Sequence, residues 1–368
     1  MAEDLPTCSN PGCDQPGTKQ CSACKTTPYC GPICQTADWI HHKEECPGHL
    51  RKLGMAHLEK AKGFHRENWV QCLRHADLAL TKLKQIKDRR LEPVKIIHDA
   101  FTLKVHALQH MYRHREALEC VKERYTMWAM NHMRNPKMFI AAFALIESCL
   151  HNGEFEDAAL YAHTAHEMVL KDADGIIPSD QRESLLAFGS SWLSQATLAL
   201  AQAGGIPPAE KQKAGEEAIA LARKALEIDT QLYGTNNPQV AMDTRALASA
   251  LEYFTDVDDD EILRLYEQST AISKRLDGKS SLNVAVGEFN LGNTYDNRAK
   301  RAMAANDLDR CMSNLELALP HSREASRICR AINFTEKADE AHRSAMHVEE
   351  LIRQIGSTRA AAATATRI

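Results

Sequence analysis

Residues 8–46 read CSNPGCDQPGTKQCSACKTTPYCGPICQTADWIHHKEEC, and their composition differs from that of the rest of this 368-residue chain. The segment holds seven of the twelve cysteines, and it is rich in proline and poor in aliphatic residues. So few apolar side chains cannot stabilise a fold by burial alone. The segment therefore needs cross-links, and its thiols are the groups that can supply them.

The spacing of these residues predicts a metal centre. Eight candidate ligands follow the pattern Cys8-x4-Cys13-x7-Cys21-x2-Cys24-x5-Cys30-x3-Cys34-x7-His42-x3-Cys46. Eight thiolate and imidazole donors make two complete tetrahedral sets, which suit zinc. We therefore expect two Zn²⁺ ions per chain. Because the protein fills every coordination position, the ions are expected to be structural and not catalytic.

Two points stay open from spacing alone. The eight ligands permit either two consecutive sites or two interleaved ones, and His41 competes with His42, although the three-residue gap to Cys46 favours His42. Disulfide bonds are the alternative to metal. The chain begins Met1-Ala2-Glu3-Asp4 without an apolar signal segment. We therefore expect an intracellular protein, cytoplasmic or nuclear, in which thiols stay reduced and bind metal.

The pattern resembles the MYND zinc finger over its full length, including CQTADWIHHK at residues 34–43. The resemblance implies interleaved sites, one made by Cys8, Cys13, Cys30 and Cys34 and the other by Cys21, Cys24, His42 and Cys46. A RING finger would need a second Cys-x2-Cys where this chain has His42-x3-Cys46. We therefore set the RING alternative aside.

The same resemblance implies a groove for proline-rich peptides. The positions that match the groove of the family are Gln35 and Trp39. An aromatic ring beside an amide suits an extended proline segment, which is ordered before it docks. The alternative, which is compatible with the first, is that Trp39 packs on the core of the finger and Gln35 is solvated.

After Leu50 the sequence changes to Ala-, Leu-, Glu- and Lys-rich stretches with apolar residues three and four apart. This periodicity predicts about twelve helices in antiparallel pairs and a mainly α fold. Short breaks separate them, at Asn135-Pro136, Asn152-Gly153, Gly204-Gly205 and Asn237-Pro238.

One segment recurs after 44 residues: Leu232-Tyr233-Gly234 with Val240-Ala241 returns as Leu276-Asp277-Gly278 with Val284-Ala285. These stretches resemble tetratricopeptide repeats, the later ones those of kinesin light chains, over about Met55 to Ile355. The resemblance implies a solenoid with an extended binding surface. The expected domains are a finger at 1–49, helical repeats at 50–355 and a disordered Ala/Thr-rich tail at 356–368.

Composition and motifs favour an adaptor over an enzyme. The net charge is −4 with acids and bases interspersed, and no long apolar run occurs, so neither a nucleic acid nor a membrane is expected as a partner. Proteins or peptides, proline-rich ones for the finger, are expected instead. No phosphate loop or nucleophile motif is present.

The alternative is a lysine methyltransferase of the SET type with an inserted MYND finger. Such an enzyme needs SET sequence before the finger, where only seven residues precede Cys8 here, and a β-rich core after it. We therefore disfavour it.

Three histidines outside the finger, His106, His110 and His114, share one face of a predicted helix. A histidine pair four residues apart can hold a metal, but no further ligand of fixed spacing completes a set here. We expect a polar contact between helices.

Overall fold

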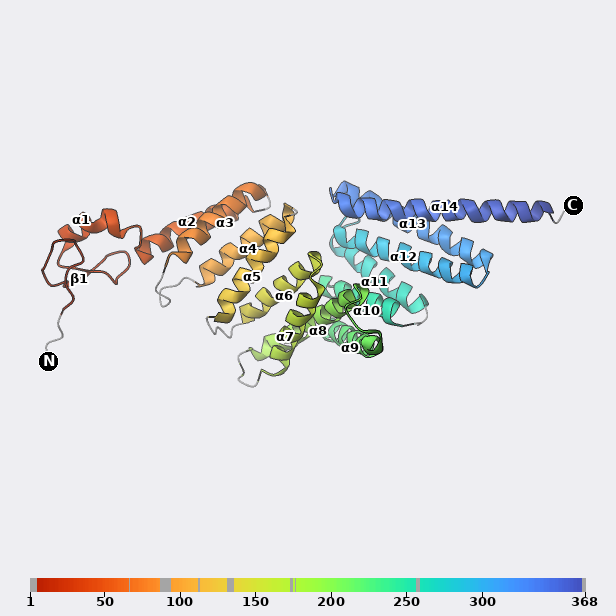
Figure 1. Cartoon of the computed structure of the whole chain (residues 1–368), viewed down its shortest axis with the longest axis horizontal. Helices are drawn as coiled ribbons and strands as arrows, with labels where there is room; N and C mark the ends of the chain where they lie inside the picture. The colour runs from red at the N-terminus through yellow and green to blue at the C-terminus, as the bar shows by residue number, and fades with distance from the viewer. Residues whose placement is uncertain are drawn as a thin grey trace. The chain divides into compact units, whose positions relative to one another are not determined.

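The computed structural model describes residues 5–65, 67–86, 94–111, 113–130, 136–172, 175, 177–255 and 259–365. The chain divides into two compact units, Met1–Gly153 and Glu154–Ile368. Within each unit, consecutive helices lie side by side (Figure 1). The described residues contain fourteen helices and two short strands, so the predicted mainly α fold is confirmed.

Unit 1 begins with a small segment of little regular structure. Strands β1 (Lys19–Gln20) and β2 (Pro28–Tyr29) pair antiparallel, with Lys19 opposite Tyr29. Helix α1 (Pro32–His42) follows directly, with proline in its first turn, where a missing N–H costs nothing. The core of this segment consists of the cysteines themselves together with Tyr29 and part of Trp39.

The rest of unit 1 is helical. Its helices are α2 (Pro47–Phe64), α3 (Trp69–Lys84), α4 (Val94–His110), α5 (His114–Met130) and α6 (Pro136–His151). Helix α3 packs against both α2 and α4, and α5 packs against both α4 and α6. Each helix therefore contacts its neighbours in sequence, as expected for a chain of helical hairpins.

Unit 2 continues the same pattern with longer helices. These are α7 (Phe155–Leu170), α8 (Ser179–Gln202), α9 (Pro208–Tyr233), α10 (Pro238–Phe254), α11 (Asp259–Leu276), α12 (Leu282–Ala304), α13 (Leu308–Ala331) and α14 (Thr335–Ala365). Contacts run between consecutive helices, and α8 also touches α10. None of the described helices is both long enough and apolar enough to span a membrane.

The 44-residue repeat predicted from sequence corresponds to one helical hairpin. Gly234 and Gly278 follow the ends of α9 and α11 with φ of 75° and 84°, a conformation that glycine adopts without steric cost. Four residues later the next helix begins, at Pro238 and at Leu282. The equivalent alanines, Ala241 and Ala285, are both buried.

Small residues allow the helices of unit 2 to approach closely. Ala222 on α9 and Ala248 on α10 are fully buried, in a cluster with Leu251, Ile262 and Tyr266. A Cβ added to Gly287 would lie 2.1 Å from Thr270 Oγ1. Alanine and glycine thus set the spacing between these helices.

Two of the predicted domain limits differ from the helix boundaries. Helix α2 begins at Pro47, so the predicted limit between residues 49 and 50 falls inside its first turn. Helix α14 continues through Ala365, past the start of the tail predicted at residue 356, and residues 366–368 lie outside the described ranges. Alanine has the highest helix propensity, so an Ala-rich segment extends a helix even without an apolar stripe.

Candidate metal centre

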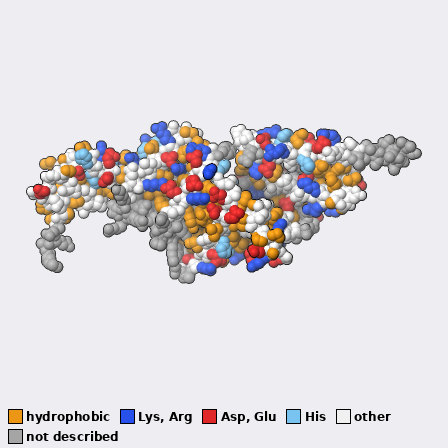
Figure 2. Space-filling model, viewed as in Figure 1, with side chains coloured by type: hydrophobic (Ala, Val, Ile, Leu, Met, Phe, Trp, Pro, Cys, Tyr) orange, Lys and Arg blue, Asp and Glu red, His pale blue; other side chains and the backbone are white. Residues whose placement is uncertain are grey.

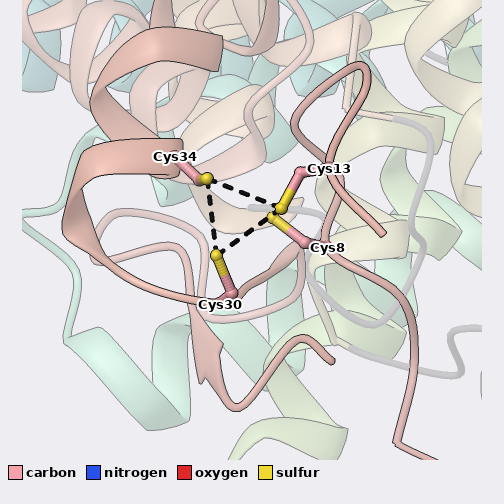
Figure 3. Close-up of side chains that lie close together, drawn as sticks. All are labelled: Cys8, Cys13, Cys30 and Cys34. Carbon is pink, nitrogen blue, oxygen red and sulfur yellow. Dashed lines mark hydrogen bonds between the residues drawn. The ribbon is translucent and has the colours of Figure 1, made fainter. Parts of the chain in front are cut away.

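The eight predicted ligands form two groups, which we call the first and second clusters. The first cluster consists of Cys8, Cys13, Cys30 and Cys34, whose sulfur atoms all lie within 4.8 Å of one another. Figure 3 shows the four sulfurs pointing toward a common centre. The distance from Cys30 Sγ to Cys34 Sγ is 3.4 Å, and Cys13 Sγ lies 3.7 Å and 3.8 Å from these two atoms.

The second cluster consists of Cys21, Cys24, His42 and Cys46, with ligand atoms again within 4.8 Å of one another. Cys24 Sγ lies 3.6 Å from His42 Nε2. Cys21 and Cys46 are fully buried, whereas His41 is exposed. The two clusters are therefore interleaved along the chain, and His42, not His41, faces the other ligands.

Distances within the clusters fit tetrahedral zinc. Ligands at about 2.3 Å for sulfur and 2.05 Å for nitrogen place two sulfurs about 3.8 Å apart, and a sulfur and a nitrogen about 3.6 Å apart. The observed separations are close to these values. A disulfide would need sulfurs at about 2.05 Å, and all twelve cysteines are free thiols. The four donors of each cluster leave no position open, so the ions they suit are structural.

Electrostatics also favour a cation in each cluster. Burial and the negative charges of Cys24 and Cys21 raise the pKa of Cys46 to about 11. The hydrogen bond with Cys34, and then burial, raise the pKa of Cys30 to about 12. Neighbouring thiolates, four in the first cluster and three in the second, repel one another, and a divalent cation compensates their charge.

Cys24 shows the opposite shift. Burial acts to raise its pKa, but hydrogen bonds from the Thr26 hydroxyl and from the backbone at Thr26 and Thr27 lower it to about 5. The Thr26 hydroxyl donates to Cys24 Sγ at 3.1 Å. Such donors hold the sulfur as a thiolate and orient it, as outer partners of metal ligands do.

Local backbone structure brings the ligands together. The Cys21 N–H donates to the Thr27 carbonyl at 2.8 Å, and the Lys25 N–H donates back to the Cys21 carbonyl at 2.9 Å. This tight knuckle requires a φ of 58° at Lys25. The β1–β2 hairpin that encloses it returns the chain to Cys30, beside the N-terminal loop that carries Cys8.

A buried hydrogen bond, missed at the sequence level, fixes α1 against β2. The Tyr29 hydroxyl donates to Asp38 Oδ2 at 2.6 Å, and both side chains are buried. Burial, and then the hydrogen bond to Asp38, raise the pKa of Tyr29. The Tyr29 ring also meets the His42 ring edge-on, with centroids 6.1 Å apart. The hydrogen-bonded pair Tyr29 and Asp38 therefore helps to position the metal ligand His42.

The two predicted peptide-binding residues lie one turn apart on α1 and are both partly exposed. The Gln35 amide donates to Ser22 Oγ at 2.9 Å and to Cys21 Sγ at 3.6 Å. Trp39 packs on the cysteine core and meets the rings of His42 and His49 edge-on. Trp39 is thus part of the core of the finger and part of its surface.

The comparisons with known proteins agree with this centre. Residues 8–46 match the family model of the MYND finger, and the match begins and ends on the first and last ligands. This segment is therefore a two-zinc finger of the MYND type, as its sequence predicted. The match covers the finger and not the helices that follow. The curated proteins contain no match to the chain.

Several solved structures resemble the helical part. A putative kinesin light chain of Podosopora anserina with nearly identical TPR-like repeats has 16% identity and a TM-score of 0.45, over 62% of this chain and 98% of that one. Apo RapI has 13% identity and a TM-score of 0.49, and the match covers 82% of this chain and 99% of RapI. Aspartyl phosphate phosphatase F of Bacillus subtilis has 13% identity and a TM-score of 0.44, and the match covers 87% of this chain and 75% of the phosphatase. Likenesses this distant carry no argument about function.

Proposed function

We propose that this protein is a non-enzymatic, intracellular adaptor with two interaction modules. In this proposal the finger, residues 1–49, binds proline-rich peptides and the helical repeats, residues 50–355, bind a second protein. The two zinc ions are held by the eight ligands of the first and second clusters and stabilise the finger. They take no part in chemistry.

The pair Gln35 and Trp39 carries this proposal. Their i, i+4 spacing places an amide and an aromatic ring side by side on α1. The NH₂ group of Gln35 donates to Ser22, and the carbonyl oxygen is the atom with which this amide can accept a hydrogen bond from a peptide. A partly exposed indole offers a flat face for proline rings, and an extended proline segment loses little entropy on binding.

The second cluster gives this surface rigidity. Gln35 reaches the sulfur of the ligand Cys21, and Trp39 packs against the ligand His42. Both side chains are thus held by zinc ligands before any peptide arrives. Such preorganisation lowers the entropic cost of binding.

The methyltransferase alternative needs a β-rich catalytic core. The only strands among the described residues are β1 and β2, of two residues each. On the face drawn in Figure 2, acidic and basic side chains are intermixed over each unit, which favours protein partners over nucleic acid.

The proposal is tested by fluorescence anisotropy of labelled proline-rich peptides with the full-length, zinc-loaded protein. Trp39→Ala is expected to weaken binding at least tenfold, because an aromatic anchor contributes about 2 kcal/mol or more. Ile33→Ala is the matched control, since Ile33 is 86% exposed on the same helix and lies on another face of it. If the Trp39 variant holds two zinc ions and binds every peptide unchanged, the groove is elsewhere and the proposal fails.

A further inference from the structure

Three histidines gather around Trp69 in unit 1, away from the finger clusters. His65 follows the end of α2, Trp69 begins α3, and His106 and His110 lie in the last two turns of α4. Nε2 of His65 and Nδ1 of His106 are 3.4 Å apart. The Trp69 ring stacks on His110 with centroids 4.1 Å apart and meets His65 edge-on at 5.1 Å.

The nitrogen separation suits a shared metal ion. Two imidazole nitrogens bound to one tetrahedral zinc at 2.0–2.1 Å lie about 3.3 Å apart. His65 and His106 therefore already present two ligand atoms at the spacing that one ion requires. They come from different helical segments, so an ion between them would join the end of α2 to α4.

His110 can supply a third ligand. It lies one helical turn after His106, and an i, i+4 pair on a helix faces the same direction. In the present arrangement its ring stacks on Trp69, so ligation by His110 requires its side chain to rotate out of that stack. Zinc with three histidines and one water is a common coordination.

We propose that His65, His106 and His110 form a third binding site for Zn²⁺, separate from the two finger clusters. Because His106 and His110 are exposed, water completes the coordination and the ion exchanges with solvent. The third ion is therefore held more weakly than the two ions enclosed by thiolates. Its effect is to fasten α4 to the end of α2 when zinc is abundant.

A second histidine pair in the same unit provides a contrast. Nδ1 of His57 and Nδ1 of His75 are 3.1 Å apart. Burial lowers the pKa of both rings; the charge of His75 lowers that of His57 further, and the positive charge of Lys60 lowers both. A positive charge beside the rings disfavours a divalent cation, and Phe64 stacks on His75. This pair is a matched control of similar geometry.

The test is a Zn²⁺ titration of full-length protein that already holds two zinc ions, followed by calorimetry and metal analysis. We expect a third ion in the wild type, its loss in the double variant His65→Ala/His106→Ala, and its retention in His57→Ala/His75→Ala. Circular dichroism checks that the variants keep their helices. A wild type that stops at two ions overturns the proposal.

Two further results would also overturn it: a third ion that persists in His65→Ala/His106→Ala, or one that disappears only in His57→Ala/His75→Ala. The single variant His110→Ala separates a three-histidine site from a two-histidine site. If His110→Ala binds the third ion as tightly as the wild type, the assignment of His110 is wrong.

Discussion

Replacing Asp229 by asparagine is expected to reduce the pH dependence of the stability of unit 2. Asp229 on α9 and Asp243 on α10 are 1% and 0% exposed. Among the described residues, apart from the two carboxyls themselves, no donor is within hydrogen-bond geometry of either oxygen of Asp229 or of Oδ2 of Asp243. Gln239 donates to Asp243 Oδ1 at 3.3 Å. Two buried carboxylates this close cannot both be charged without a large free-energy cost.

The size of the effect on the free energy of unfolding follows from the raised pKa of Asp229. Burial, then the hydrogen bond and the charge of Asp243, raise the pKa of Asp229 to about 8. Burial also raises the pKa of Asp243. In the unfolded chain an aspartate has a pKa of about 4. The folded state therefore holds the proton more tightly, and the stabilisation from it is complete below about pH 4 and is lost as the pH rises toward 8.

Between these values the free energy of unfolding falls by about 1.4 kcal/mol per pH unit, which amounts to about 4 kcal/mol at pH 7. Asp229→Asn leaves one carboxyl and no repulsion. It should stabilise unit 2 at pH 7 by up to that amount and flatten the pH profile. Urea unfolding at pH 5 to 8, followed through the fluorescence of Trp192 on α8, measures both effects.

The matched control is Asp339→Asn, which makes the same change of charge at an exposed position on α14. It should keep the pH profile of the wild type. The reasoning is refuted if Asp229→Asn and the wild type lose stability in parallel between pH 5 and 8.

Three other outcomes are expected. A strong chelator should release two zinc ions per chain and unfold the finger, since each ion contributes about 10–16 kcal/mol to folding. The helical circular dichroism signal of unit 2 should persist. Metal analysis that finds one released ion per chain, or none, would contradict this. Tyr29→Phe should weaken zinc retention and cost about 1–3 kcal/mol, because Asp38 then lacks its buried donor; equal chelator resistance would contradict it. Gly287→Ala should destabilise unit 2 by about 1–3 kcal/mol in thermal unfolding, since the new Cβ collides with Thr270. The control is Gly63→Ala, whose new Cβ has no atom within 4 Å, and it should be neutral or stabilising.

The metal ligands could be predicted from sequence because their chemistry and spacing are local. Spacing alone left the pairing of the eight ligands open. Interleaving depends on how the β1–β2 hairpin returns the chain to Cys30, which only the family resemblance could supply. The Tyr29–Asp38 bond was missed because it needs the direction in which α1 folds back on β2.

The helices were predictable for a similar reason, since apolar periodicity and turn residues act over a few positions. The division after Gly153 was not, because Asn152-Gly153 resembles every other break in the sequence. The acid pair was also invisible: Asp229 and Asp243 lie 14 residues apart, and each looks like an ordinary surface charge until α9 and α10 pack together.

Only four residues, 43–46, connect α1 to α2, and zinc ligands lie at both ends of this connection. His42 ends α1, Cys46 immediately precedes α2 and its carbonyl accepts the Leu50 N–H at 2.9 Å, and both side chains belong to the second cluster. The ion bound there acts as a cross-link between two helices, comparable to a disulfide across a very short loop. Removal of that single ion would let α1 and α2 reorient independently, although the polypeptide stays intact.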